Sequence, residues 1–176
     1  TRICWGVRVR IRAAAASIPC RSIGGDFYDY VDLSDGSLGF ALGDVAGKGP
    51  PAALLSAMMQ GIFAAQAATS DAPSKTITRV NLALYRRGIE SRFVTLMYGS
   101  LQANGQLLYC NAGHNPPLVV GKNGFRRLEC GGPIVGLGVD ARRCPAPLLV
   151  ERGEGIGQRA GKQLGAVLED LRGLPH

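Results

Sequence analysis

Apolar and polar residues alternate along the first part of the chain, which is the period-two pattern of β-strands. Basic and apolar residues take turns over residues 7–12. Two apolar-rich runs, 27–33 and 38–42, flank the turn sequence Ser34-Asp35-Gly36. An Asp-Gly turn between two such runs is typical of a β-hairpin. The pattern therefore predicts an early strand followed by a hairpin.

The spacing of apolar residues then lengthens to three and four, which indicates helices. The first stretch opens at Pro50-Pro51, and proline is tolerated in the first turn of a helix. Its apolar positions are Leu54, Leu55, Met58, Met59, Ile62 and Phe63. A second stretch over residues 77–84 ends near Gly88. We expect two helices, with the stripe over residues 54–63 in the core.

Strand-like sequence returns after the second helix. Residues 93–101 are rich in β-formers, and Asn104-Gly105, a strong hairpin signal, joins them to residues 106–111. Another hairpin is predicted over residues 117–128. Strands, then two helices, then strands predict an α+β fold in which helices pack on antiparallel sheet.

Composition adds that the chain suits one globular domain. With 176 residues, of which 46% are apolar, it is long enough to bury a core without disulfides. No run of about 18 apolar residues occurs, so we expect no membrane span. The five cysteines are odd in number and widely spaced, which argues against a zinc site or a disulfide framework. We expect a soluble protein of the reducing cytoplasm.

The net charge of +7 raises the question of nucleic acid, because basic domains often follow phosphate backbones. The basic residues are dispersed, as singles and as pairs such as Arg86-Arg87 and Arg126-Arg127. No aromatic residues are interleaved with them, and no nucleic-acid-binding motif is recognisable. We therefore expect no nucleic-acid partner.

Two glycine-flanked acidic segments carry the candidate chemistry, at residues 24–29 and 43–49. In the predicted hairpin Asp26 begins one strand and Asp44 ends its partner, so antiparallel pairing would bring both carboxylates to one end of the sheet. Hard divalent cations take oxygen ligands, and glycine lets the backbone approach an ion. The pattern favours a Mg²⁺ or Mn²⁺ site, although Asp and Gly also mark ordinary turns.

Other catalytic chemistries fit the sequence less well. Residues 43–49 lack the spacing of a Walker phosphate-binding loop, and Lys48-Gly49 is not followed by Ser or Thr. No G-x-S-x-G motif is present, and His114 has no nucleophile beside it in the sequence. The sequence does not support a serine or cysteine nucleophile.

The chain also contains five ordered segments: GGDFYD, GDVAGKGPPAALL, RFVTLMYG, NAGHNPP and GGPIVGL. They resemble segments of SpoIIE-type phosphatases, the bacterial branch of the PPM or type-2C-like metal-dependent protein serine/threonine phosphatases, and the resemblance covers residues 17–139. It implies an antiparallel β-sandwich flanked by helices, with two Mn²⁺ or Mg²⁺ ions at one end. On this resemblance Asp44 bridges both ions, the Val45 carbonyl binds one of them, and Asp26 binds directly or through water.

The resemblance further implies hydrolysis of phosphoserine or phosphothreonine on a small regulatory protein. Asp26 and Asp44 would be the catalytic residues, because paired metal ions activate water for attack on phosphorus. The expected partner is a phosphorylated anti-sigma-factor antagonist, as in bacterial partner-switching signalling. The family also allows an upstream sensor domain or a dimer.

Four further residues are candidates for substrate binding or for support of the site: Gly25, Lys48, His114 and Asn115. Lys48 could attract a phosphate, but an exposed, solvated lysine is the simpler interpretation. His114 and Asn115 lie in NAGHNPP, and we favour a strand-end turn fixed by Pro116-Pro117 as their role.

The chain departs from the family pattern after residue 137. There the family continues to an Asp-Gly segment and a later aspartate that both supply metal ligands, and this chain has neither. We therefore divide the chain into a phosphatase domain over residues 1–140 and a divergent tail over residues 141–176. The alternative function is a catalytically inactive phosphatase-like domain that binds a phosphoprotein. In the tail the spacing of Leu164, Val167, Leu168 and Leu171 predicts a terminal helix.

Overall fold

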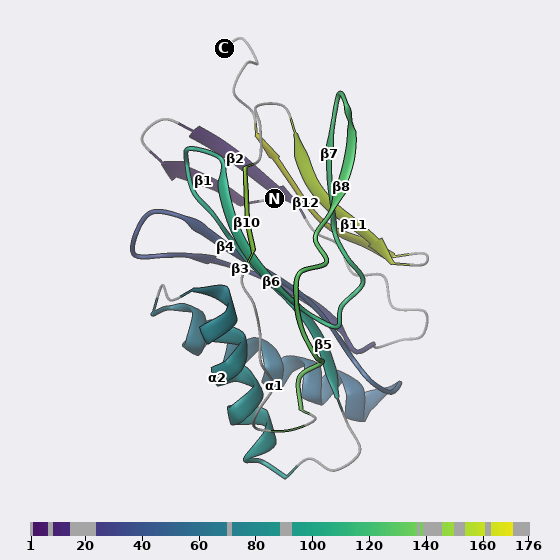
Figure 1. Ribbon diagram of the computed structural model, residues 1–176. Coiled ribbons are helices and arrows are strands. Elements are labelled where there is room, and N and C mark those ends of the chain that lie inside the picture. The colour runs from purple at the N-terminus through teal and green to yellow at the C-terminus, as the bar shows by residue number, and fades with distance from the viewer. Residues whose placement is uncertain are drawn as a thin grey trace.

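The computed structural model describes residues 2–6, 9–14, 24–69, 72–88, 93–136, 138, 146–149, 154–160 and 163–170. Within them two β-sheets and a pair of helices lie in three layers (Figure 1). The first sheet contains, in spatial order, β10 (Ala146–Leu149), β6 (Gln106–Ala112), β5 (Val94–Leu101), β4 (Leu38–Val45) and β3 (Asp26–Asp32). The second contains β1 (Arg2–Gly6), β2 (Val9–Ala14), β12 (Gln163–Asp170), β11 (Gly155–Ala160), β7 (Leu118–Gly121) and β8 (Gly124–Arg127). The short β9 (Gly131–Gly132) pairs in parallel with β6.

The three predicted hairpins are confirmed, and with them the α+β class. β3 pairs antiparallel with β4, β5 with β6, and β7 with β8. The strand predicted over residues 7–12 is present from Val9 onward as β2, and residues 7 and 8 lie outside the described residues. Because turn sequences fix the hairpin registers, these pairings determine which residues meet at each end of the first sheet.

Two helices, α1 (Pro50–Ala67) and α2 (Pro73–Tyr85), cover the face of the first sheet that points away from the second sheet (Figure 1). The expected core stripe of α1 is wrong for Leu54, which is 73% exposed while Leu55 is buried. Adjacent residues of a helix point about 100° apart, so Leu54 and Leu55 face different directions, and Leu55 is the one that faces the core. No helix in the described part of the chain is both long and apolar enough to cross a membrane.

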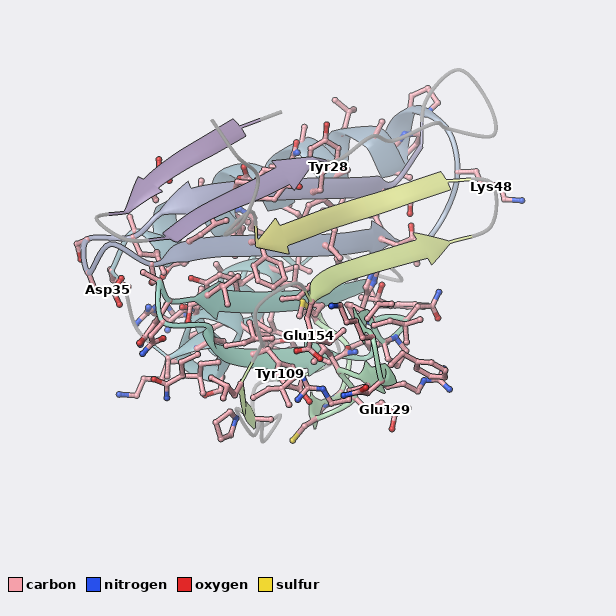
Figure 2. The ribbon with its side chains drawn as sticks, turned by 90° about the horizontal axis from the view of Figure 1, so that it is seen from above. Tyr28, Asp35, Lys48, Tyr109, Glu129 and Glu154 are labelled. Carbon is pink, nitrogen blue, oxygen red and sulfur yellow. The ribbon has the colours of Figure 1, made fainter. Side chains whose placement is uncertain are left out.

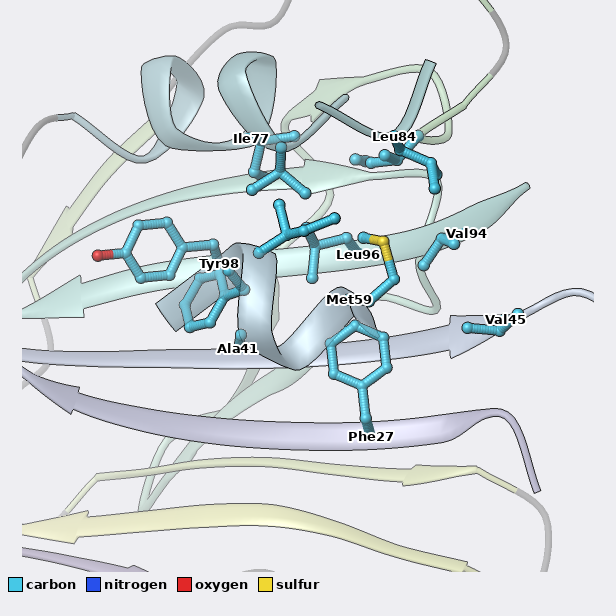
Figure 3. Packing of buried hydrophobic residues seen from close by; sticks show 14 of the residues in the cluster. Phe27, Ala41, Val45, Met59, Ile77, Leu84, Val94, Leu96 and Tyr98 are labelled. Carbon is cyan, nitrogen blue, oxygen red and sulfur yellow. The ribbon is translucent and has the colours of Figure 1, made fainter. Parts of the chain in front are cut away.

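The first sheet is covered by apolar residues on both faces. One core lies between this sheet and the helices, and it includes the edge-on pair Phe63 and Tyr98, with ring centroids 5.0 Å apart (Figure 3). The other lies between the two sheets, where Phe40 and Met97 of the first sheet join Val119 and Ile156 of the second. With both faces covered, the strands that lead to the candidate site are held from both sides.

The predicted terminal helix is wrong within the described residues, because Gln163–Asp170 forms strand β12. This segment also reads with period two, since Leu164, Ala166 and Leu168 alternate with other residues. β12 lies between β2 and β11 and pairs antiparallel with both, so its backbone groups find partners on two sides. Leu171 lies outside the described residues. The domain boundary at residue 140 stays a prediction.

Candidate metal site

Asp26 and Asp44 face each other across the β3–β4 pair. Asp26 is the first residue of β3, and Asp44, near the end of β4, is its direct partner in the register. Opposed residues of antiparallel strands point to the same face, with Cβ atoms about 5 Å apart. The prediction that both aspartates lie at one end of the sheet is therefore confirmed. Figure 2 shows the two ends of these strands, with Asp35 in the β3–β4 turn at one and Lys48 beyond β4 at the other.

The carboxyl group of Asp44 is perturbed by its surroundings. Partial burial of its carboxyl raises the pKa of Asp44, although the residue as a whole is exposed. The negative charge of Asp26 and a hydrogen bond between the two carboxyl groups raise that pKa further. A divalent cation placed between the carboxylates would replace this repulsion by attraction. The pair therefore has the charge that a cation site requires.

Next to the pair, glycine at position 25 leaves room beside a backbone oxygen. A Cβ atom at Gly25 would stand 2.6 Å from the Val45 carbonyl oxygen and 3.1 Å from the Val45 Cβ. The Val45 N–H donates to the Gly25 carbonyl over 3.3 Å, which ties the two residues together. Gly25 thus keeps side-chain atoms away from the Val45 carbonyl.

Thr95 extends the acidic pair into a polar row across three strands. It is the direct partner of Asp44 on β5, and its hydroxyl donates a long hydrogen bond of 3.4 Å to the Asp44 carbonyl. The same oxygen lies 2.7 Å from Nδ1 of His114. The row therefore runs from Asp26 through Asp44 and Thr95 to His114. The sequence interpretation missed Thr95, whose signal was a polar residue between two apolar strand positions.

The buried side chain of Asn111 holds the turn that carries His114. Its Oδ1 accepts from the His114 N–H at 2.7 Å, and its Nδ2 donates to the His114 carbonyl at 2.9 Å. A third bond, of 3.1 Å, runs from Nδ2 to the Leu128 carbonyl. The sequence predicted a turn here and assigned it to Pro116-Pro117, whereas these hydrogen bonds come from Asn111. Asn111 is the second residue that the sequence interpretation missed.

Lys48 and Asn115 are both exposed. Lys48 follows the end of β4 and its side chain extends away from both sheets (Figure 2). The structure thus brings Gly25, Asp26, Asp44 and Val45 together and connects His114 to them through Thr95. For Lys48 the interpretation as a solvated lysine stands.

The residues at this end of the sheet fit a hard divalent cation in their chemistry. They offer two carboxylates and one backbone carbonyl, all of them oxygen donors. Among the described residues, no three or more His, Cys, Asp or Glu side chains gather as a ready metal cluster. The described part of the chain therefore supplies an incomplete oxygen shell.

Replacing Asp44 by asparagine should stabilise the metal-free protein. The amide keeps the shape of the side chain and removes a like charge opposite Asp26, a repulsion of about 0.5 kcal/mol. We expect Tm in EDTA at pH 7 to rise by about 1 to 2 °C. The gain should shrink as the pH falls through the raised pKa of Asp44, because the wild-type carboxyl is then neutral as well.

Asp32→Asn is the matched control for this measurement, because Asp32 lies at the other end of β3 and is opposed by Leu38. It should give no gain in Tm. An Asp44→Asn protein that melts at or below the wild-type temperature in EDTA would contradict the repulsion between Asp26 and Asp44.

Replacing Gly25 by alanine should weaken Mn²⁺ binding about tenfold while the protein stays folded. The new methyl group would press on the Val45 carbonyl, a backbone group that can yield only by shifting the strand end. Titration followed by the electron paramagnetic resonance of unbound Mn²⁺ measures the change. Gly61→Ala is the control, since nothing lies within 4 Å of the added Cβ. Equal affinities in all three proteins would exclude a role for the Val45 carbonyl.

Comparisons with known proteins support the predicted fold and family. A family profile described as Stage II sporulation protein E (SpoIIE) matches residues 34–155. This match begins after Asp26 and extends beyond residue 139, where the sequence resemblance ended. Phosphoserine phosphatase RsbU of Bacillus subtilis (strain 168) is 31% identical over 129 residues, which cover 72% of this chain and 38% of RsbU.

Two solved structures share the fold. One contains the RsbU and RsbW domains of Rv1364c from Mycobacterium tuberculosis, with a TM-score of 0.70 and 26% identity, over 84% of this chain and 42% of that chain. The other contains the PP2C phosphatase domain of SpoIIE from Bacillus subtilis, with a TM-score of 0.71 and 17% identity, over 85% of this chain and 44% of that chain. The expected PPM-type phosphatase fold is thus confirmed. The chain spans less than half the length of each of these relatives.

Proposed function

Because the chain belongs to the SpoIIE family, we propose that it hydrolyses phosphoserine or phosphothreonine on a regulatory protein, with divalent metal ions held at Asp26 and Asp44. The observation that carries this proposal is the direct pairing of the two aspartates at one end of the first sheet. The proposed substrate class is supported by the 31% identity to RsbU, which is named a phosphoserine phosphatase.

Each residue of the site has a part in this proposal. Asp44, which lies between Asp26 and Thr95 in the row, would hold both ions, while Asp26 and the Val45 carbonyl would each add a ligand. When bound, paired Mn²⁺ or Mg²⁺ ions supply an activated water and neutralise charge on the phosphoryl group. The protein's own contribution is to hold the two carboxylates on neighbouring strands, so that they need little reorganisation when a substrate arrives.

The partner that we propose is a phosphorylated protein of the anti-sigma-factor antagonist kind. RsbU itself and the structure that joins RsbU and RsbW domains support this assignment. We also propose an upstream sensor domain or a dimer, as the family resemblance implies. The thiol groups of Cys110 and Cys130 fit a reducing cytoplasm as the place of action.

Phosphate release from an aryl phosphate and from a phosphoserine peptide, with Mn²⁺, Mg²⁺ or EDTA, tests the proposal. Release from the peptide that requires a metal would support it. Peptide binding without release would support the alternative, a catalytically inactive domain that binds a phosphoprotein. If the chain neither binds nor cleaves phosphopeptides in the presence of Mn²⁺ or Mg²⁺, both the phosphatase function and the phosphoprotein-binding function are rejected.

A further inference from the structure

We infer that Thr95 is a positioning residue, which orients the ring of His114 at the edge of the Asp26–Asp44 pair and through this orientation supports turnover. The inference rests on the proposed function and adds to it a residue that acts through His114. Three observations support it. They are the register of β3, β4 and β5, the short contact between the Thr95 hydroxyl and the His114 ring, and the separate hydrogen bonds of Asn111 to the His114 backbone.

The pleat of β5 puts Thr95 on the same face as the acidic pair. Val94 and Leu96, on either side of it, are fully buried in the core beneath the helices. Successive residues of a strand point to opposite faces, so Thr95 points to the face toward the second sheet. There it lies directly opposite Asp44, which in turn lies opposite Asp26.

The hydroxyl of Thr95 has two neighbours and a single hydrogen. Its distance to Nδ1 of His114 is 2.7 Å, and its distance to the Asp44 carbonyl oxygen is 3.4 Å. The contact with the ring is therefore the strong one. This contact occupies Nδ1 of the ring. A hydrogen bond at one ring nitrogen fixes the orientation and tautomer of a histidine in this manner.

The backbone of His114 is held separately from its ring. Asn111, which is 4% exposed, bonds both the N–H and the carbonyl of His114. Asn111 is itself anchored, because its own N–H donates to the Cys130 carbonyl at 2.9 Å. The main chain of His114 is thus fixed by Asn111 and its ring by Thr95. A ring held at both ends has less rotational freedom to lose when a substrate binds.

A structural role for Thr95 and a positioning role predict different results. Thr95 and His114 are only partly buried, and neither belongs to the apolar cores on the two faces of the sheet. Loss of the Thr95 hydroxyl should therefore disturb the orientation of the ring and leave the fold nearly unchanged. A structural role would instead lower the melting temperature and leave the residual enzyme unaltered.

The test is a double-mutant cycle on metal-dependent turnover of a phosphoserine peptide. Thr95→Val keeps the shape and removes the hydroxyl, and it should lower kcat about tenfold with little change in KM or Tm. Thr95→Ser should recover most of the activity. In a His114→Ala background, Thr95→Val should cost nothing more. The inference is overturned if Thr95→Val costs the same in both backgrounds, or if Thr95→Val is as active as the wild type.

A second readout separates this inference from the proposed function. The sequence holds two histidines, His114 and His176, so a His114→Ala variant assigns the ring ¹⁵N resonances of His114. Thr95→Val should shift both ring nitrogens, and Thr95→Ser should keep the wild-type shifts. Unchanged shifts in Thr95→Val would overturn the inference even in an active phosphatase. Changed shifts in a chain without turnover would support the hold of Thr95 on the ring and reject the proposed function.

Discussion

Alanine at Asp44 should lower metal-dependent turnover by a factor of at least about 10³, whereas alanine at His114 should lower it by about ten- to a hundredfold. The larger factor corresponds to about 4 kcal/mol of transition-state stabilisation. Asp44 lies between Asp26 and Thr95 in the row and is the ligand proposed to hold both ions, so its loss would remove the activated water and the charge neutralisation together. His114 is joined to the pair through Thr95 and is not one of the proposed ligands, so the ions would remain in its absence.

Turnover of an aryl phosphate and of a phosphoserine peptide under saturating Mn²⁺ measures both losses. Asp32→Ala, at the far end of the strand that carries Asp26, serves as the matched control and should keep most of the activity. Melting temperatures of all variants identify any loss that comes from unfolding. Equal losses for Asp44→Ala and His114→Ala would contradict the roles assigned to these two residues.

The acidic pair could be predicted because every step toward it is local in sequence. The turn at residues 34–36 sets the register of β3 and β4, and in that register Asp26 meets Asp44. A shift by one residue would have turned one of the two side chains to the opposite face. Hairpins of this kind carry their own pairing information, and the same holds for the Asn104-Gly105 hairpin between β5 and β6.

Thr95 and the Leu128 contact of Asn111 could not be predicted in the same way, because their partners come from other parts of the chain. Thr95 meets Asp44 only after β5 pairs with β4, across the two helices in sequence. Asn111 bonds Leu128, 17 residues further on, as well as the nearby His114. A polar residue in an apolar strand signals that a partner is needed, and it does not say which one.

The wrong interpretation of the tail has a related cause. Leu164, Val167 and Leu168 fit a helical spacing, and the same segment also fits a strand. The segment forms a strand because β2 and β11 supply hydrogen-bond partners on both sides of β12. The sequence of the segment itself does not indicate these two neighbouring strands. Tertiary pairing therefore overrides a weak local pattern here.

This chain should bind Mn²⁺ weakly, with dissociation constants of about 10⁻⁴ to 10⁻³ M, and turn over slowly. A hard divalent ion takes about six oxygen ligands, and the site as described offers the carboxylates of Asp26 and Asp44 and the Val45 carbonyl. Fewer carboxylates also mean less negative charge to hold two cations near each other. The second ion should therefore bind more weakly than the first.

Calorimetric titration with Mn²⁺ tests this prediction. It compares the Mn²⁺ affinity of the wild-type chain with that of a chimaera in which residues 138–176 are replaced by the corresponding region of RsbU from Bacillus subtilis. The resemblance to the family implies that this region restores the missing acidic ligands, so the chimaera should bind at least about a hundredfold more tightly and turn over faster. Asp140→Asn and Asp170→Asn in the unmodified chain test whether either residue substitutes for them, and we expect no change in affinity. Two tight sites with full turnover in the unmodified chain would show the prediction to be wrong, because Asp26, Asp44 and the Val45 carbonyl would then not be the whole of its ligand set.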